Sequence, residues 1–411
     1  MSGLFKAIDK CRICRSTDLL DVISLGSQAL SGCFPAQDEP DPDVAPLHLL
    51  RCESCGLVQL AHSVDPKFLY TSNYGYRSGI NETMRQHLAG IAAELLSRFQ
   101  PAPGRVVLDI GCNDGTLLDQ YPSTLVRLGI DPLADKFSSM HPKGISTATS
   151  VFSARTFERL AGGQKASVIT SIAMFYDLED PNEFVADIAR SLDPDGIWVL
   201  EQSYMPQMLK YNSYDTICHE HLEYYALRQI DRLAEHNGLR VFDAELNDTN
   251  GGSSRLYICH ENALHRATRR LVDLRAAEQS YGLNIQVTYD AFRQRCAKLR
   301  EELRTLIKTE VARKKRIHIY GASTKGNTIL QYCGLDHSLI EAAADRNPEK
   351  SGARTPGTNI PIVSEEESRG MRPDYFLVLP WHFRKEFIQR EREFLARGGK
   401  FIFPLPQLEI F

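Results

Sequence analysis

The chain has 411 residues, of which 43% are hydrophobic, and its formal net charge is −4. This length favours two or three domains with buried cores, and the weak negative charge gives no general reason to expect nucleic acid or an anionic membrane surface as a partner. Because no apolar run is long enough to span a bilayer and no secretory segment precedes the first cysteines, we expect a cytoplasmic protein. The composition leaves its oligomeric state undecided.

Four of the ten cysteines form two C-x-x-C pairs within residues 1–65, with a loop rich in Pro and Asp between the pairs. Such pairs in a reducing compartment usually bind a metal or carry out redox chemistry. One redox pair would suffice, so two pairs favour a tetrahedral site of four thiolates with no position left for substrate. The sequence therefore predicts a module folded around a structural Zn²⁺, with the ligands Cys11, Cys14, Cys52 and Cys55.

Residues 66–262 open with a helical stretch and then alternate strand-like and helix-like segments. The strand-like segments are VVLDIG, LVRLGIDP, SVITSI and GIWVLEQ, and the helix-like ones are FERLA and FVADIARSL. Strands that alternate with helices are typical of a parallel, doubly wound sheet. We expect an α/β, Rossmann-like domain here.

A glycine-containing turn follows the first of these strands, in VVLDIGCNDGTLL. Its glycines let the backbone approach a ligand, and the helix N-terminus beyond them offers free N–H groups. The candidate cofactor ligands in the turn are Asp109, Gly111, Asn113 and Gly115. Because Asn113 replaces the second glycine of G-x-G-x-x-G, the turn is similar instead to motif I of class I S-adenosylmethionine (SAM) methyltransferases.

Asp131 ends the next strand, in GIDP, about 20 residues after the first acidic residue, which is the spacing of a nucleoside site. A carboxylate suits this position because it can accept hydrogen bonds from both ribose hydroxyls. NAD remains a competing cofactor. A purely structural alternative is that Asp109 and Asp131 cap a turn and a helix.

The stretch CHEHLEYY, residues 218–225, places two histidines and two carboxylates within five positions. The zinc-protease signature needs histidines at i and i+4 of a helix, but Glu223 stands four residues after His219. Acid–base chemistry suits histidine better here, because its ordinary pKa lies near neutrality. Successive residues in an extended loop face opposite ways, which leaves a core role open for His219 and for His221. We expect Glu223 to be a cap or a surface charge.

Residues 263–411 begin with charged helices that we interpret as a solvated bridge. The strand-like segments RIHIYG, IEAAADR, YFLVLP and KFIFPLP then predict a second Rossmann-like unit. Its first strand leads into a glycine-containing turn where Ser323, Thr324 and Lys325 could hold a diphosphate at a helix N-terminus. Alone, this turn would also fit NAD or a structural role. Trp381 and His382 could contact a base or a sugar.

Together these motifs resemble one family over essentially the whole chain, the zinc-containing, three-domain sugar C-methyltransferases that act on nucleotide-linked 4-keto-6-deoxy sugars. The matching segments are the two C-x-x-C pairs, YGYRSGINETMRQH, DIGCNDG, LEQSY, YDTICHEHLEYY, NGGSSRLY, YGASTKGNTILQ and DRNPEKSG. The resemblance implies a zinc-binding module over 1–65, a SAM domain over 66–262, and a helical bridge with a sugar-nucleotide domain over 263–411.

Three positions depart from that family. Cys218 stands where relatives often have tyrosine, and Asn250 where they often have histidine. The loop after SVITSI, which carries a histidine in relatives, here contains Tyr176 and Asp177. The roles of those side chains therefore do not transfer directly to this chain.

The resemblance implies SAM-dependent methylation of carbon, at C3 of the sugar. A base must remove the proton next to the ketone, and a donor must stabilise the enolate oxygen. The implied base is His221 with Glu220 beside it, and His219 is the less favoured base. Tyr76, in the YGYRSG loop, would close over the site and donate to the enolate oxygen.

Three alternatives stay open at this point. The first is O- or N-methylation of a sugar or small molecule, which needs no carbanion. The second is an NAD-dependent sugar-nucleotide oxidoreductase that uses the turn at Ser323 to Lys325. The third is a non-catalytic module that binds zinc and a nucleotide.

Overall fold

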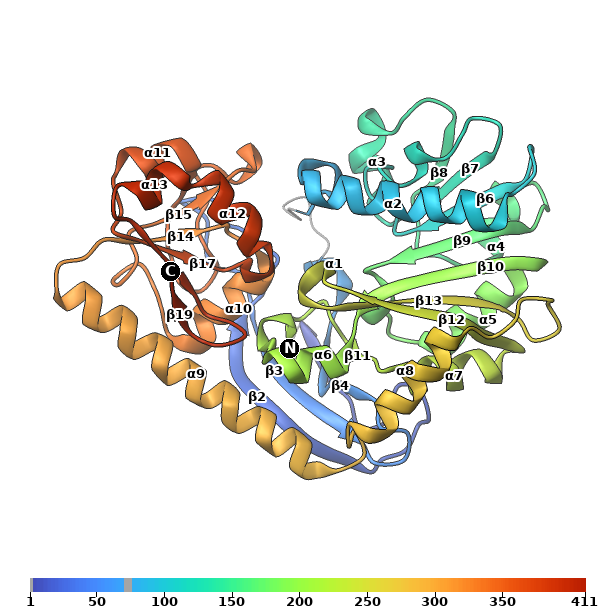
Figure 1. Cartoon of the computed structure of the whole chain (residues 1–411), viewed down its shortest axis with the longest axis horizontal. Helices are drawn as coiled ribbons and strands as arrows, with labels where there is room; N and C mark the ends of the chain where they lie inside the picture. Colours follow the sequence, from blue (N-terminus) through green and yellow to red (C-terminus); the bar gives the residue numbers. More distant parts are fainter. Residues whose placement is uncertain (1–2, 70–75) are drawn as a thin grey trace.

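The computed structural model describes residues 3–69 and 76–411. Figure 1 shows two lobes, one for each of two open sheets, with the N-terminal strands lying between and below them. Short 3-10 turns connect many of the elements, and their bounds are Ser78–Ile80, Leu118–Gln120, Ser138–Met140, Phe175–Asp177, Tyr214–Thr216, Thr249–Gly251, Pro348–Lys350 and Trp381–Phe383.

The N-terminal module is built on an antiparallel sheet in the order β11-β4-β3-β2. Its strands are β2 (Leu19–Ala29), β3 (Val44–Cys52), β4 (Val58–Leu60) and β11 (Glu223–Tyr224). A second pair joins β1 (Phe5–Ala7) to β5 (His62–Val64), and the short helix α1 (Pro66–Leu69) follows. The strand β11 comes from the middle of the chain, so the CHEHLEYY stretch is part of the zinc module's sheet.

The middle lobe holds a seven-stranded sheet in the order β12-β13-β10-β9-β6-β7-β8. The strands are β6 (Val106–Ile110), β7 (Val126–Ile130), β8 (Ile145–Ala148), β9 (Ala166–Ile172), β10 (Leu192–Ser203), β12 (Leu239–Asn247) and β13 (Ser253–His260). Five strands are parallel, and the hairpin β12–β13 adds an antiparallel edge. All five residues of β6 are buried, as expected for a strand covered on both faces.

Helices pack around this sheet, and the sequence explains where several of them begin. They are α2 (Glu82–Phe99), α3 (Ala134–Phe137), α4 (Ala154–Leu160), α5 (Pro181–Ser191), α6 (Met205–Tyr211), α7 (Leu227–His236) and α8 (Arg269–Ser280). Asp180 caps α5 by accepting from the amides of Asn182 and Glu183, and Pro181 occupies the first turn. The strand order reverses at β6, between β7 and β9, and such a reversal opens a crevice for ligands at the carboxyl ends of the strands.

The C-terminal lobe repeats the plan with a six-stranded sheet in the order β16-β15-β14-β17-β18-β19. Its strands are β14 (Ile317–Tyr320), β15 (Ala342–Asp345), β16 (Ile362–Ser364), β17 (Tyr375–Val378), β18 (Lys400–Phe403) and β19 (Glu409–Ile410). Its helices are α10 (Thr324–Cys333), α11 (Glu365–Gly370), α12 (Arg384–Arg390) and α13 (Arg392–Ala396). The expected α/β class with two Rossmann-like units and a cysteine-marked module is confirmed.

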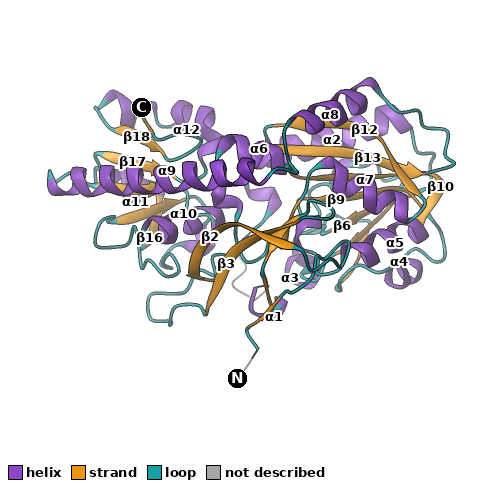
Figure 2. Cartoon of the chain, turned by 90° about the horizontal axis from the view of Figure 1, so that it is seen from below, coloured by secondary structure: helices purple, strands orange, loops and turns teal. Residues whose placement is uncertain are grey.

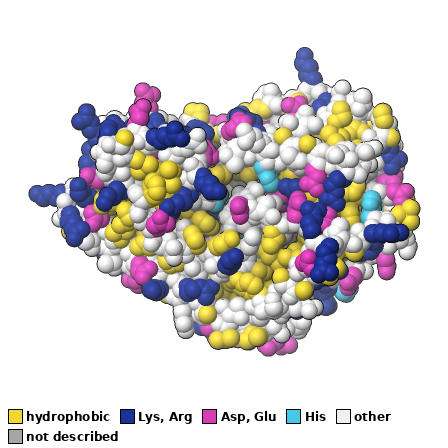
Figure 3. All heavy atoms as spheres, viewed as in Figure 1, with side chains coloured by type: hydrophobic (Ala, Val, Ile, Leu, Met, Phe, Trp, Pro, Cys, Tyr) yellow, Lys and Arg dark blue, Asp and Glu magenta, His cyan; other side chains and the backbone are white. Residues whose placement is uncertain are grey.

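The long helix α9 (Gln286–Ala312) runs along the lower edge of the C-terminal lobe and past β2 (Figures 1 and 2). Its buried residues recur every three or four positions, so one stripe of the helix packs on the protein and the rest faces solvent. The face in Figure 3 carries basic and acidic side chains interspersed, and its upper outline is notched between the lobes. Within residues 3–69 and 76–411, no helix is long and apolar enough to cross a membrane.

Candidate active site

The four cysteines of the N-terminal module converge on one point. The Sγ atoms of Cys11 and Cys55 are 3.5 Å apart, as are those of Cys14 and Cys52, and all four lie within 4.8 Å of one another. Four thiolates bound tetrahedrally at the usual Zn–S length would be about 3.8 Å apart. The donor set and its spacing therefore fit a Zn²⁺ ion, which would tie the start of the chain to the end of β3.

The turn after β6 carries the residues expected to bind the cofactor. Asp131 accepts hydrogen bonds from the amide of Asn113 (2.9 Å, to Oδ2) and from that of Leu133 (2.6 Å, to Oδ1). A carboxylate has about four lone-pair sites, so both oxygens can still accept from a ribose. Gly111 has φ +76° and Gly115 φ +78°, which only glycine adopts without strain. The turn is thus shaped for close approach of a nucleoside.

Asp109 lies beneath this turn at the end of β6. It is 4% exposed and accepts a 2.6 Å hydrogen bond from the Thr170 hydroxyl. Burial raises the pKa of Asp109 to about 7, and the nearby charge of Asp131 acts in the same direction. The carboxyl is therefore held where it can change charge near neutral pH.

The end of the YGYRSG loop closes over the same turn. The amide of Ser78 donates to Asn113 Oδ1 (3.1 Å), and the amide of Gly79 donates to Asp114 Oδ2 (2.9 Å). The Asn113 side chain in turn donates to the Tyr76 carbonyl (3.4 Å). Tyr76 itself is 49% exposed. The loop is therefore positioned by the cofactor turn, while the Tyr76 side chain remains accessible from solvent.

His221 is oriented by the backbone of its own loop. Its Nδ1 lies 2.8 Å from the Thr216 carbonyl oxygen. Because a carbonyl can only accept, Nδ1 carries the proton and Nε2 keeps its lone pair. The ring also lies 4.2 Å from the Tyr176 ring. Burial lowers the pKa of His221 to about 3, and the charge of Lys325 acts in the same direction. The imidazole is therefore neutral at physiological pH.

His219 points toward the N-terminal module instead. Its Nε2 lies 3.0 Å from the Ala45 carbonyl oxygen, so that nitrogen donates, and the side chain is 1% exposed. Burial lowers the pKa of His219 to about 4. The two histidines thus contact different parts of the protein.

The expectation that Glu223 is a cap or a surface charge is wrong. Glu223 is 1% exposed, and its carboxylate lies 3.6 Å from the Arg12 guanidinium. The reason is the short strand β11, in which Glu223 pairs with Gln59 and enters the sheet of the zinc module. Glu223 therefore lies buried at the junction between the loop and that module.

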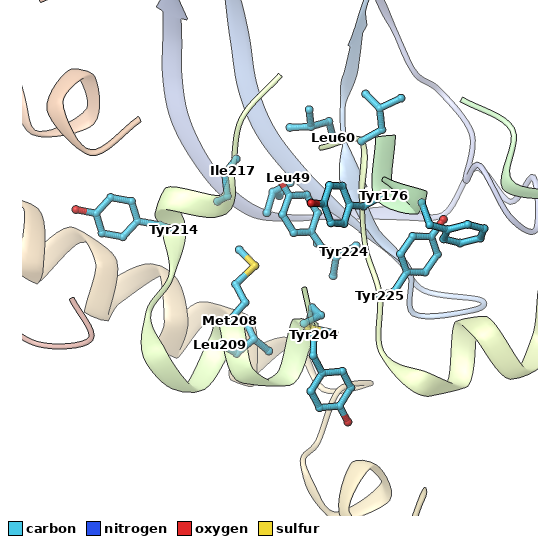
Figure 4. Packing of buried hydrophobic residues seen from close by; sticks show 14 of the residues in the cluster. Leu49, Leu60, Tyr176, Tyr204, Met208, Leu209, Tyr214, Ile217, Tyr224 and Tyr225 are labelled. Carbon is cyan, nitrogen blue, oxygen red and sulfur yellow. The ribbon is translucent and has the colours of Figure 1, made fainter. Parts of the chain in front are cut away.

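Aromatic and aliphatic side chains pack around this loop. Figure 4 shows Tyr176, from the turn after β9, beside Tyr224 of β11, with Leu49 of β3 and Ile217 next to them. The amide of Leu222 donates to the Tyr176 carbonyl (2.7 Å). Met174, two residues before Tyr176, lies against Gly111, so this packing connects the loop to the cofactor turn.

The turn after β14 brings its predicted ligands to the same loop. Ser323 caps α10 by accepting from the amide of Gly326 (3.1 Å). The Lys325 ammonium donates to the Asn250 carbonyl of the middle lobe (3.0 Å). Burial lowers the pKa of His382, as it does that of His221, and the charge of Lys325 acts in the same direction on both. Thr324 and Glu220 both lie close to Gly32 of the N-terminal module.

Glu220 and Asp215 carry buried oxygens without hydrogen-bond partners in the described part of the chain. Glu220 is 7% exposed, and burial raises its pKa. Asp215, 1% exposed, accepts at Oδ2 from the Trp381 indole (3.0 Å), while its Oδ1 is unpaired. The Oε2 of Glu220 and Nδ1 of His382 are unpaired too. Unpaired buried polar atoms around one histidine indicate a site for a polar ligand.

Asp215 was missed from the sequence because it lies outside the CHEHLEYY stretch. Its signal would have been the block YDTICHEHLEYY, which begins before that stretch. Its contact with Trp381 joins residues 166 positions apart, so spacing alone cannot reveal it.

Comparisons with known proteins agree with this three-part plan. Residues 11–70 match a family described as a zinc binding domain, 82–244 a methyltransferase domain, and 248–406 a C-methyltransferase C-terminal domain. The chain is 33% identical over 412 residues to the C-methyltransferase NovU of Streptomyces niveus, covering 99% of this chain and 98% of that protein.

Two similar solved structures each cover less than half of this chain. A magnesium protoporphyrin IX methyltransferase from Synechocystis PCC 6803 with bound S-adenosylhomocysteine (SAH) is 15% identical, with 44% of this chain and 88% of that chain covered and a TM-score of 0.34. The YcgJ protein from Bacillus subtilis is 13% identical, with 42% and 97% covered and a TM-score of 0.33.

The family settles the choice between SAM and NAD that the glycine turn left undecided, because residues 82–244 are a methyltransferase domain. It also identifies the cysteine cluster as a zinc site rather than a redox pair. The oxidoreductase and the non-catalytic alternatives are thereby excluded. The chain belongs to the family of three-domain C-methyltransferases with a zinc-binding module, and it is a SAM-dependent enzyme.

Proposed function

We propose that this enzyme methylates C3 of a nucleotide-linked 4-keto-6-deoxy sugar after removing the proton next to the ketone. SAM supplies an electrophilic methyl group on a positively charged sulfur. The observation that carries the proposal is His221, a partly buried neutral histidine with one nitrogen committed to a carbonyl and the other available to accept a proton. Carbon methylation needs such a base, whereas methylation of an oxygen or amine makes no carbanion.

His221 is the proposed base, acting through Nε2. Its hydrogen bond to Thr216 orients the ring and fixes its tautomer. The low pKa of His221 makes it a weak base in the free enzyme, and the negative charge of a bound diphosphate would raise that pKa by opposing Lys325. His219 is the weaker candidate, since its ring is buried against Ala45.

Glu220, Lys325 and Tyr76 are proposed to act on the acceptor. The unpaired oxygen of Glu220 suits a sugar hydroxyl or the developing charge on His221. Tyr76 has an accessible side chain on a loop already anchored to the cofactor turn, so it can close over the sugar and donate to the enolate oxygen.

The diphosphate is proposed to lie at the N-terminus of α10, on Ser323, Thr324 and Lys325. The helix dipole favours an anion there. A second cation supports this placement, because the Lys350 ammonium donates to the Ala322 carbonyl in the same turn (2.7 Å). In this scheme residues 1–65, 66–262 and 263–411 serve zinc, SAM and sugar nucleotide in turn.

Deuterium exchange tests the proposal directly. The enzyme is incubated in deuterium oxide without methyl donor, with a panel of dTDP- and GDP-linked 4-keto sugars, and mass increase at the carbon next to the ketone is followed. We expect wild type to exchange that proton on at least one sugar, and His221→Asn to lose exchange by at least about 100-fold.

His219→Asn is the matched control and should keep exchange. Exchange at the wild-type rate in His221→Asn would remove this residue from the base role. A methylated product without any exchange in wild type would instead favour methylation of an oxygen or nitrogen. Addition of SAM should then yield one extra methyl group on the exchanged carbon.

A further inference from the structure

The segment that follows β2 of the zinc module lies against the C-terminal lobe. The Ala29 amide donates to Gln331 Oε1 (2.7 Å), and the Gln331 side chain donates back to the Ala29 carbonyl (3.2 Å). Asn327 donates to the Ser31 carbonyl one turn earlier on α10 (2.8 Å). The segment is therefore fixed along the first two turns of α10.

The same helix also holds the loop that contains His221. Thr328 donates through its hydroxyl to the Ile217 carbonyl (3.2 Å). The zinc module, the middle lobe and the C-terminal lobe thus meet at the start of α10. A small residue at this junction leaves room for the three parts to pack closely against one another.

Gly32 lies at this junction, close to Glu220 and Thr324. A Cβ atom added there would lie 2.2 Å from Glu220 Oε1 and 4.0 Å from the Thr324 hydroxyl oxygen. Gly32 does not have a positive φ, so its backbone conformation is open to any residue. Glycine is therefore needed at this position for space and not for backbone freedom.

The group that would meet the Cβ is the end of a side chain, not backbone. Glu220 is 7% exposed, so its carboxylate lies inside the protein and not in open solvent. One oxygen lies against Gly32, and the other, Oε2, has no hydrogen-bond partner within the described residues. A methyl group at position 32 would push the carboxylate toward the acceptor and leave the fold in place.

We infer that Gly32 is a positioning residue of the active site, through which the zinc module sets the place of the Glu220 carboxylate. This inference rests on the proposed function only in assigning the Glu220 carboxylate to the acceptor site. The zinc module is then one wall of the active site.

The test is Gly32→Ala, with Gly90→Ala as a matched control, since a Cβ at Gly90 meets nothing within 4 Å. Rates are measured in single-turnover reactions with radiolabelled SAM, which detect slow variants. We expect Gly32→Ala to lower the methylation rate about 100-fold, the cost of a misplacement near 1 Å. Zinc content, Tm and SAM affinity should match wild type.

The same substitution made in a Glu220→Asp variant tests whether the loss of rate depends on the position of the carboxylate. In Glu220→Asp the shorter side chain leaves room for the added methyl, so Gly32→Ala should then lower the rate by no more than about threefold. An equal loss in both backgrounds would overturn the inference, as would a Gly32→Ala rate within about twofold of wild type. If Gly32→Ala did not fold, the double variant should restore folding, and failure to do so would also overturn it.

These outcomes are separable from those of the proposed function. If wild type methylates an acceptor without exchanging the proton, the carbanion mechanism fails while the Gly32 measurement still applies to that acceptor. If exchange occurs as proposed and Gly32→Ala is as active as wild type, only the positioning role is lost.

Discussion

The two Rossmann-like lobes build nearly the same backbone turn. In the middle lobe the Gly111 amide donates to Ile130 (2.8 Å), and the Asn113 amide donates to Asp131 (2.9 Å). In the C-terminal lobe the Gly321 amide donates to the Ala344 carbonyl and the Ala322 amide to Asp345, both at 2.8 Å. In each, the carboxylate that ends the neighbouring strand holds the turn after the first strand.

The charges around these turns are opposite. The middle turn is surrounded by the buried carboxylates of Asp109, Asp114 and Asp131, of which Asp114 is paired with Arg77. The C-terminal turn has Lys325 and Lys350 at the start of a ten-residue helix. An acidic turn suits a sulfonium and a ribose, and a basic turn at a helix N-terminus suits phosphate. The same framework therefore suits ligands of opposite charge in the proposed scheme, because the side chains around the two turns differ.

We expect the largest effect from replacing each of the two equivalent carboxylates, Asp131 and Asp345, by alanine in separate variants. Asp131→Ala should weaken SAM binding about 100-fold, because it removes both the support of the turn and two charge-assisted hydrogen bonds to the ribose. Binding of GDP or dTDP should be unchanged. Titration calorimetry with each ligand measures both effects.

Asp345→Ala is the matched control in the other lobe. It should leave SAM affinity at the wild-type value, because its turn lies in a separate sheet. Equal weakening of SAM by both variants would mean that the two turns do not bind different ligands.

Removal of one cation in the C-terminal turn should have a smaller effect. We expect Lys325→Met to weaken GDP or dTDP binding about 30-fold, as for loss of one charge-assisted hydrogen bond. SAM affinity should stay the same, and the salt dependence of nucleotide binding should decrease. Lys298→Met, on the solvent side of α9, is the control, since the Lys298 side chain is 75% exposed.

A different result would change the role proposed for Lys325. Unchanged nucleotide affinity with a slowed deuterium exchange would place its ammonium at the ketone oxygen instead of the diphosphate. That outcome is compatible with its electrostatic effect on His221.

The sequence predicted the parts of this comparison that depend on local pattern. Alternating strands and helices gave two Rossmann-like lobes, and the two C-x-x-C pairs gave the zinc module, because periodicity and ligand spacing are local properties. The glycine turns were also visible, since each directly follows an apolar strand. Their opposite charges could be read from Asp109 and Lys325 in the sequence.

Contacts between the three parts could not be predicted in this way. The strand β11 is only two residues long, and it pairs with β4 across more than 160 positions of sequence. Glu223 consequently looked like a surface charge and is buried beside Arg12. The space that Glu220 needs at Gly32 depends on how the zinc module and the two lobes pack together, and the neighbouring sequence does not indicate it.

The pKa of Asp109 offers a finer probe of the acidic turn. Burial raises this pKa to about 7, so the carboxyl gains its negative charge as pH rises through neutrality. A cationic ligand binds the ionised form better, and its affinity must rise over the same pH range. We expect SAM affinity to increase about tenfold from pH 6 to pH 8, a size reasonable for two charges near a protein surface.

SAH separates this effect from other titrations, because it shares the amino acid and nucleoside groups of SAM but has a neutral sulfur. The ratio of SAM to SAH affinity should therefore rise with pH in wild type and be flat in Asp109→Asn, which keeps the acceptor for the Thr170 hydroxyl. A ratio that rises equally in both proteins would assign the pH dependence to another group. A flat ratio in wild type would mean that the charge of Asp109 does not reach the sulfonium, and the acidic turn would then serve the ribose alone.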